Sequence, residues 1–374
     1  SHQESRFMEI DWPLYHWHLE PSSVCTLKCP RCPRTEFPNT PWINKNMSLA
    51  DVKLFLTTEI LKTKVKRITM CGDVGDPIYC TDYLKICKYI KETNPLIHIV
   101  TITNGSHKKP AWWDALASIL NEHDSINFSI DGFDNTSNNL YRVNSNFDSI
   151  INGIRAFREQ NTETFLTWAL IVFNFNEHHL DKIKDIAIGL KMDTIQITKS
   201  TKFGSKYGNA YGGNDDALEP SPKWISSSDR YERSVIRISD RIQDTSVYMK
   251  QNEDLYNMIL EKYKDSHILP LCEIGNRGIY INAEGVVFPC SWTSFPYDSL
   301  SHGDKTINWK DSFFATYRSE MNIHNHSFDN IINNKKWNLC SSGWNDKNKT
   351  WVECSQKCNK HVVDKNYAVG WETN

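Results

Sequence analysis

The stretch Cys25-Thr26-Leu27-Lys28-Cys29-Pro30-Arg31-Cys32 places three thiols within eight residues of a 374-residue chain. It follows Tyr15–Glu20, where apolar and polar side chains alternate as in a β-strand. Zinc sites usually pair two Cys-x-x-Cys knuckles, or two cysteines with two histidines, to complete four ligands. Three cysteines at this spacing can instead hold three irons of a [4Fe–4S] cluster and leave the fourth iron open. A zinc knuckle with a distant fourth ligand is the alternative.

The chain beyond this stretch repeats a strand-then-helix pattern, which is typical of βα units around a parallel sheet. The predicted strands are Tyr15–Glu20, Arg67–Cys71, Ile97–Thr103, Ser125–Asp131, Phe165–Phe173 and Thr194–Lys199. The predicted helices are Ser48–Leu61, Thr81–Thr93, Pro110–Leu120, Phe147–Glu159 and Glu177–Leu190. Six units are too few for a closed eight-stranded barrel. We therefore expect an α/β fold with a partial (β/α)6 TIM-type barrel and a ligand site at the carboxyl ends of its strands.

The pattern changes after residue 200. Gly204–Pro222 is rich in Gly, Asn, Ser and Asp and is predicted to be a loop, and the amphipathic stretches Ser226–Ile242 and Glu253–Lys264 are predicted to be helices of a lid. Gly278–Cys290 predicts two short strands around an Ala-Glu-Gly turn. The predicted division is a barrel core at 1–200, a linker or lid with helices at 201–270 and a small cysteine-rich domain at 271–374.

Composition excludes several classes of protein. With 43 basic and 45 acidic residues the net charge is -2, so no overall field draws the chain to nucleic acid or anionic lipid. The longest apolar run, Trp168–Phe173, is too short to span a membrane, and the polar start Ser1–Ser5 has no signal-peptide core. Its first two residues, Ser1 and His2, look like a tag remnant. We expect a cytoplasmic protein, in which eleven cysteines argue for metal or redox chemistry instead of disulfides.

Further motifs follow the predicted strands in order: Gly72-Asp73-Val74-Gly75-Asp76-Pro77, Thr103-Asn104-Gly105 and Ser129-Ile130-Asp131-Gly132. With the three cysteines, this order resembles the radical S-adenosylmethionine (radical SAM) superfamily over nearly the whole chain. The resemblance implies a [4Fe–4S] cluster on Cys25, Cys29 and Cys32, whose open iron binds S-adenosylmethionine (SAM). It assigns cofactor binding to Gly75, Asp76, Pro77, Asn104, Ser129, Asp131 and Arg142.

Two residues depart from the family pattern. Asp76 stands where relatives carry Glu, which shortens the side chain by one methylene. Arg31 stands where relatives commonly place an aromatic or apolar residue near the adenine. Its guanidinium plane either stacks on the adenine or faces solvent.

The C-terminal cysteines resemble a second family element. Cys272, with Gly285 and Cys290 at the expected spacing, resembles the opening of the auxiliary-cluster domain called SPASM. Only Cys340, Cys354 and Cys358 follow, which suffices for one four-cysteine cluster and implies the shortened version called twitch, with one auxiliary [4Fe–4S] cluster. Cys272, Cys290 and Cys358 are the expected ligands, and Cys340 and Cys354 compete for the fourth place. Zinc held by four cysteines is the alternative.

The first strand carries a polar face. His16, His18 and Glu20 alternate with apolar residues and are predicted to face the barrel lumen. Substrate contact, a hydrogen-bonded polar network and a metal site are all open for these three residues. The other cysteines, Cys71, Cys80 and Cys87, are predicted to be buried packing residues.

The resemblance implies an enzyme that cleaves SAM reductively to a 5′-deoxyadenosyl radical, which abstracts a substrate hydrogen, with an electron from a reductase or flavodoxin-type donor. The C-terminal domain favours a peptide or peptide-like substrate that is crosslinked, epimerised or oxidised. Only 24 residues precede Cys25, so we expect no N-terminal leader-binding module. A small-molecule dehydrogenase or epimerase is the alternative, and a non-catalytic iron–sulfur scaffold or redox sensor is a second. No catalytic residue is assigned.

Overall fold

The computed structural model describes residues 14–36, 43–200, 202–203, 216–226, 232–241, 246–274, 279–294, 313–337, 341, 343–361 and 363. The chain divides into two compact units. Unit 1 comprises residues 1–20, 47–69 and 244–373, and unit 2 comprises residues 21–46, 70–243 and 374.

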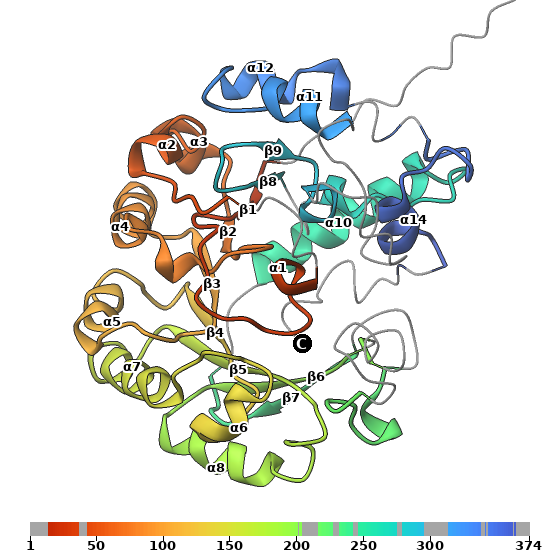
Figure 1. Ribbon diagram of the computed structural model, residues 1–374. Helices are drawn as coiled ribbons and strands as arrows, with labels where there is room; N and C mark the ends of the chain where they lie inside the picture. The colour runs from red at the N-terminus through yellow and green to blue at the C-terminus, as the bar shows by residue number, and fades with distance from the viewer. Residues whose placement is uncertain are drawn as a thin grey trace, which may run out of the picture. The chain divides into compact units, whose positions relative to one another are not determined.

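Unit 2 is built on parallel strands. β3 (His98–Thr103), β4 (Ser125–Ser129), β5 (Phe165–Ile171) and β6 (Thr194–Lys199) pair in chain order, and β7 (Glu232–Arg237) is antiparallel to β6. Four helices lie along one side of these strands (Figure 1): α4 (Tyr83–Thr93), α5 (Pro110–Ala117), α7 (Phe147–Gln160) and α8 (Leu180–Gly189). Shorter helical segments are α1 (Pro33–Glu36), η1 (Pro77–Tyr79), α6 (Asn135–Asn139) and η3 (Pro222–Trp224). Trp113, Phe128, Phe157 and Trp168 are fully buried between helices and sheet.

Unit 1 has the strand order β2-β1-β8-β9, formed by β2 (Arg67–Met70), β1 (His16–Leu19), β8 (Ile279–Ile281) and β9 (Val287–Phe288). β8 pairs in parallel with β1 and antiparallel with β9. Its α-helices are α2 (Leu49–Lys53), α3 (Thr58–Thr63), α10 (Ser246–Lys262), α11 (Phe313–Glu320), α12 (Phe328–Ile332) and α14 (Val352–Cys358). Its 3₁₀ segments are η4 (Leu271–Ile274), η5 (Ser291–Ser294) and η7 (Lys335–Trp337). The Trp17 ring packs against Phe55 and Phe328, with centroids 5.9 and 5.1 Å apart.

The predicted fold class is confirmed: the fold is α/β, with a parallel-rich sheet that does not close into a ring. All six predicted strands form, at β1 to β6. The predicted hairpin also forms, and Gly285 supplies its turn with a φ of 82°, which a side chain would strain. Within the described residues no helix is long and apolar enough to cross a membrane.

Two predicted helices are wrong. Ser48–Leu61 is not one helix but two, because Thr57 adopts an extended conformation and its side chain accepts a hydrogen bond from the Ile60 amide, which starts α3 anew. The stretch Ser226–Ile242 contains strand β7 instead of a helix. It pairs antiparallel with β6, with Ile236 opposite Ile195, and so extends the sheet at that edge. The helix predicted at Glu253–Lys264 is confirmed within α10.

Candidate active site

The carboxyl ends of the unit 2 strands surround a cavity of about 300 Å³. Thr103 and Asn104 at the end of β3, Ser129 at the end of β4 and Ile171 at the end of β5 line it, together with the loop at residues 71–76. Parallel strands bring their carboxyl ends to one edge, so residues far apart in sequence meet there.

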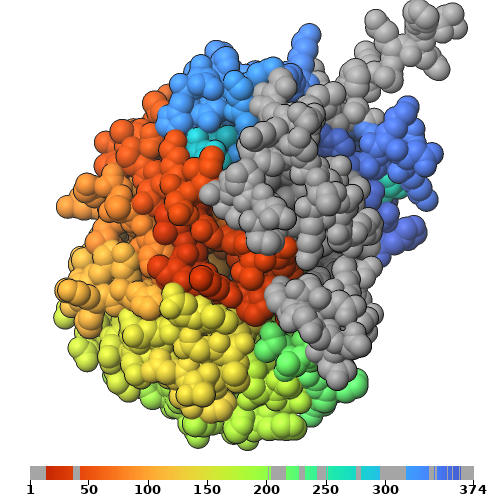
Figure 2. Space-filling view, viewed as in Figure 1, coloured from red at the N-terminus to blue at the C-terminus, as the bar shows by residue number. Residues whose placement is uncertain are grey.

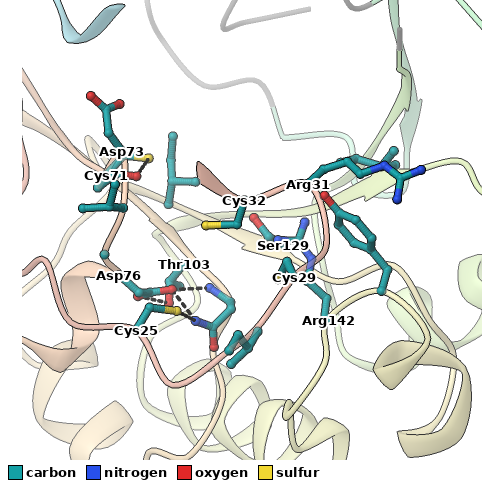
Figure 3. A pocket seen from close by; sticks show the side chains of 18 of the residues that line it. Cys25, Cys29, Arg31, Cys32, Cys71, Asp73, Asp76, Thr103, Ser129 and Arg142 are labelled. Carbon is teal, nitrogen blue, oxygen red and sulfur yellow. Dashed lines mark hydrogen bonds between the residues drawn. The ribbon is translucent and has the colours of Figure 1, made fainter. Parts of the chain in front are cut away.

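Cys25, Cys29 and Cys32 line this cavity from a single loop (Figure 3). The loop closes on itself where the Cys32 amide donates to the Cys29 carbonyl at 3.1 Å, and α1 begins directly after it. The three thiols of the sequence motif thus line one cavity at the carboxyl ends of the strands.

The thiols are shielded from water. Burial raises the pKa of Cys25 to about 12 and that of Cys29 to about 11. For Cys29 the nearby Arg142 guanidinium opposes the rise, because a cation stabilises the thiolate. Iron binds thiolates, so loading this site with metal releases the protons that burial retains.

The three cysteines offer ligands for either a cluster or an ion. Each cysteine of a [4Fe–4S] cluster binds a different iron, whereas zinc requires every ligand sulfur at about 2.3 Å from one centre. Among the described residues, no group of three His, Cys, Asp or Glu side chains is arranged to hold a metal ion in the positions seen here. The three thiols share one loop beside a cavity, and their side chains would turn to bind either metal.

Asp76 is the most heavily bonded acid of the cavity wall. Its Oδ1 accepts from the Thr103 hydroxyl at 2.7 Å and the Ile78 amide at 3.2 Å. Its Oδ2 accepts from the amide and the side-chain nitrogen of Asn104, at 2.7 and 2.6 Å. Burial raises the pKa of Asp76 to about 6, and these donors oppose the rise. The Asn104 side chain in turn donates to the Cys25 sulfur at 3.8 Å, so Asp76 positions a group that contacts the cysteine loop.

Asp131 and Arg142 form an ion pair. Arg142 Nε donates to Asp131 Oδ2 at 2.6 Å, and Asp131 Oδ1 accepts from the Ile171 amide at 2.8 Å. Arg142 lines the cavity, whereas Asp131 is fully buried behind it and is not part of the lining. Of the seven residues predicted to bind the cofactor, Gly75, Asp76, Asn104, Ser129 and Arg142 line the cavity, and Pro77 and Asp131 lie outside its lining.

Arg31 does not face solvent, contrary to one of its two predicted placements. It is 5% exposed and lines the cavity. Its guanidinium forms an ion pair with Asp216, and its Nε donates to the Lys202 carbonyl at 3.2 Å. Lys202 Nζ donates back to the Arg31 carbonyl at 3.1 Å. These bonds fix the residues beyond β6 against the cysteine loop.

The cavity contains residues that sequence reasoning missed. Cys71 was predicted to be a packing residue, but it is half-buried and lines the cavity, while Cys80 and Cys87 are buried as predicted. Ser200 and Lys202 were not singled out, although they directly follow the sixth predicted strand. The expectation that residues at the carboxyl ends of parallel strands line the ligand site would have identified both of them.

The polar face of β1 forms contacts within unit 1. His16 Nε2 and the Thr69 hydroxyl are 3.0 Å apart, and Glu20 accepts from the Tyr280 hydroxyl at 3.1 Å. The His18 ring meets the Tyr280 ring edge to face, with centroids 4.8 Å apart. These contacts form a polar row across β2, β1 and β8, and substrate contact by the three residues stays a prediction.

A second group of cysteines gathers in unit 1. Cys272 of η4, Cys290 after β9, and Cys354 and Cys358 of α14 line one small cavity. Cys354 and Cys358 are four residues apart and share a helix face. Burial raises the pKa of Cys272, and the neighbouring thiols of Cys358, Cys290 and Cys354 add to the rise. Cys340 lies outside the described residues.

The open space among these four cysteines is about 20 Å³. A cluster would therefore need their side chains to turn outward from the positions seen here. Trp292 and Trp344 contribute to the wall, so the fluorescence of both indole rings is available to report on changes near the sulfurs.

A partial barrel with three thiols on one loop at the carboxyl ends of its strands is typical of an iron–sulfur enzyme. Residues 19–187 match the family model described as the radical SAM superfamily. Residues 19–187 of the chain thus form a radical SAM domain.

No curated protein matches the chain. Solved structures with a similar fold include native anSMEcpe with bound AdoMet and the Cp18Cys peptide, at 14% identity, 94% coverage of this chain, 86% of that chain and a TM-score of 0.49. SuiB of Streptococcus suis bound to S-adenosylmethionine is 14% identical, with 90% and 72% covered and a TM-score of 0.47. BtrN in complex with AdoMet and 2-DOIA is 12% identical, with 95% and 96% covered and a TM-score of 0.43.

Gly75 gives the first testable prediction. A Cβ at this position would lie 1.9 Å from the Ser22 carbonyl oxygen, so Gly75→Ala forces two backbone segments of the cavity wall apart. We expect the free energy of unfolding, measured by chemical denaturation, to fall by about 1–3 kcal/mol. Gly189→Ala is the matched control, because a Cβ there meets nothing within 4 Å. Equal stability of the two variants would contradict the close packing.

Proposed function

We propose that this chain is a radical SAM enzyme whose active site is the unit 2 cavity. The observation that carries the proposal is that Cys25, Cys29 and Cys32 share one cavity with Asn104 and Arg142. When bound, the cluster and SAM supply a 5′-deoxyadenosyl radical that abstracts a hydrogen atom from substrate.

In this proposal the three cysteines bind three irons and leave the fourth for SAM. The backbone at residues 72–75 accepts hydrogen bonds from the methionine amino group, since glycines let a ligand approach the carbonyls. Asp76 is a positioning residue. A carboxylate accepts about four hydrogen bonds, and the chain itself provides four donors to Asp76.

The opposite wall completes the proposed cofactor site. Ser129 lines the cavity and would accept from ribose hydroxyls of bound SAM, and Asp131 holds the Arg142 guanidinium at the cavity. Ile171 and Phe173 line the same space and keep water from the reacting groups.

We further propose one auxiliary [4Fe–4S] cluster in unit 1, on Cys272, Cys290, Cys354 and Cys358. The shared lining of these four thiols supports it. This choice makes Cys354 the fourth ligand in place of Cys340, and it corresponds to a twitch-type domain. Zinc is the alternative occupant of this site, and metal analysis distinguishes it from iron.

The proposed substrate is a peptide or peptide-like molecule. The four-cysteine site supports this class, because the auxiliary-cluster domain that it resembles occurs in peptide-modifying enzymes. The reaction would be a crosslink, an epimerisation or an oxidation, and the electron would come from a reductase or flavodoxin-type donor.

Loss of one cluster cysteine tests the activity itself. Anaerobically reconstituted protein, reduced with dithionite and given SAM, is expected to release 5′-deoxyadenosine, measured by liquid chromatography. Cys29→Ala is expected to abolish release, because one iron loses its ligand, whereas Cys87→Ala removes a fully buried thiol outside the cavity and keeps it. No release from the unsubstituted protein would favour a scaffold or sensor.

Iron analysis tests the auxiliary cluster. We expect about eight irons per chain, four for each [4Fe–4S] cluster. Cys354→Ala is expected to lower the count to about four and Cys340→Ala to leave it unchanged. About four irons with one zinc in the unsubstituted protein would assign the unit 1 site to zinc.

The substrate class is testable with a peptide encoded next to this chain's gene. Incubated with reduced protein and SAM, it is expected to lose two hydrogens, as in a crosslink or oxidation, or to gain deuterium from heavy water, as in an epimerisation. Mass spectrometry reads both results. An unchanged peptide beside rapid SAM cleavage would favour a small-molecule substrate.

A further inference from the structure

One face of unit 2 lies directly outside the cysteine loop. It consists of Thr26 and Lys28 of that loop, His107–Lys109 after β3, and Leu140–Asn144 after α6, and we call it the outer loop face. Figure 2 shows the red surface of the N-terminal segment beside the yellow surface that includes residues near 140.

The cysteine loop separates this face from the cavity by one layer of chain. Leu27 and Cys29 point inward and are 7% and 8% exposed, whereas Thr26 and Lys28 between and beside them are exposed. Cys25 and Cys29, which line the cavity, thus flank side chains that reach solvent. In unit 2 an electron that enters at Lys28 would cross only this loop to reach the cavity.

Hydrogen bonds hold the three segments of the face together. The Lys28 amide donates to the Val143 carbonyl at 2.9 Å, and Asn144 Nδ2 donates to the Thr26 carbonyl at 2.7 Å. His107 Nε2 is 2.8 Å from the Asn144 carbonyl. Asn144 reaches both neighbours with a φ of 71°, in the left-handed region that asparagine adopts more readily than most residues. The face is therefore preformed.

The face is positively charged. Residues 26–28, 105–109 and 140–146 include Lys28, His107, Lys108 and Lys109 and contain no Asp or Glu. Arg142 is balanced by Asp131, so the three lysines set the sign. Asp114, Asp134 and Asp148 lie nearby along the chain but outside these three segments. Asp134 accepts from the Ser137 amide at 2.7 Å, and Asp148 accepts from Asn135 at 2.6 Å.

The face also exposes large apolar side chains. Leu140 is 50% exposed and Val143 is 37% exposed, three residues apart. Exposed aliphatic groups ringed by charges of one sign are typical of a transient protein contact.

We propose that the outer loop face docks an acidic one-electron carrier protein of the flavodoxin class. The proposal rests on the proposed function, because it assigns the electron donor for the cluster of the cysteine loop. The step moves one electron from the reduced carrier to the oxidised cluster and transfers no atom. The excess of Lys attracts an acidic carrier, Leu140 and Val143 provide apolar contact, and the single chain layer keeps the transfer distance short.

Charge reversal on the face tests the proposal. The rate constant for cluster reduction is measured anaerobically by absorbance, with a reduced acidic flavodoxin as one reductant and dithionite as the other. The double variant Lys28→Glu/Lys109→Glu is expected to react about tenfold more slowly with flavodoxin at low ionic strength, because electrostatic attraction is lost. Its rate with dithionite is expected to stay unchanged.

Lys184→Glu is the matched control, since Lys184 is an exposed lysine of α8, away from the face. Flavodoxin rates that agree within about twofold between the double variant and this control would overturn the proposal. If the unsubstituted protein holds no cluster that dithionite reduces, the proposed function fails instead.

Cross-linking of the unsubstituted protein removes any dependence on variant folding. A carbodiimide joins lysines to the carboxylates of the bound flavodoxin, and mass spectrometry identifies them. Links at Lys28 and Lys109 are expected, and added salt should abolish them. Links only at lysines elsewhere, such as Lys184, would overturn the proposal.

Discussion

The cavity depends on one buried carboxylate. Asp76 joins the end of β3 to η1, the 3₁₀ segment that directly follows Asp76 in the chain. Its two carboxylate oxygens accept hydrogen bonds from Thr103, Asn104 and Ile78. The Asn104 side chain, which Asp76 holds in place, also donates a hydrogen bond to the Cys25 sulfur. Leaving any of these buried donors without an acceptor costs about 1–3 kcal/mol, so the position tolerates little change. The longer Glu of relatives would displace the same donors by one methylene.

Two further ion pairs fix the opposite wall. Arg142 with Asp131 and Arg31 with Asp216 are largely buried, where desolvation offsets much of the attraction between the charges. Their effect is better described as positional. Asp131 holds Arg142 beside Cys29, and Arg31 joins the cysteine loop to residues that follow β6. Together with Asp76 they surround the thiols with groups that cannot rotate freely.

The sequence predicted the parts of the site that local patterns encode. Two local patterns suffice to predict which residues meet at the cavity. One is the spacing of Cys25, Cys29 and Cys32, and the other is the position of each motif at a strand end, since the carboxyl ends of parallel strands share an edge. Strand β7 was missed because Val235, Ile238 and Ile242 recur at the spacing of an amphipathic helix, and only the pairing with β6 shows that the stretch contains a strand. The Arg31–Asp216 pair joins residues 185 positions apart, and Cys354 meets Cys272 only through the fold, so neither follows from local spacing.

The cysteine loop has two faces with different chemistry. Its inward side chains, Leu27 and Cys29, are buried beside the cavity, and its outward side chains, Thr26 and Lys28, belong to a positively charged surface. A radical enzyme must admit an electron but exclude water and stray hydrogen donors from the same centre. A single layer of chain, held on both sides by hydrogen bonds to Val143, Asn144 and Asn104, meets both requirements. An electron can cross such a layer without any opening, whereas water and substrate cannot, so the donor and the substrate need not compete for one entrance.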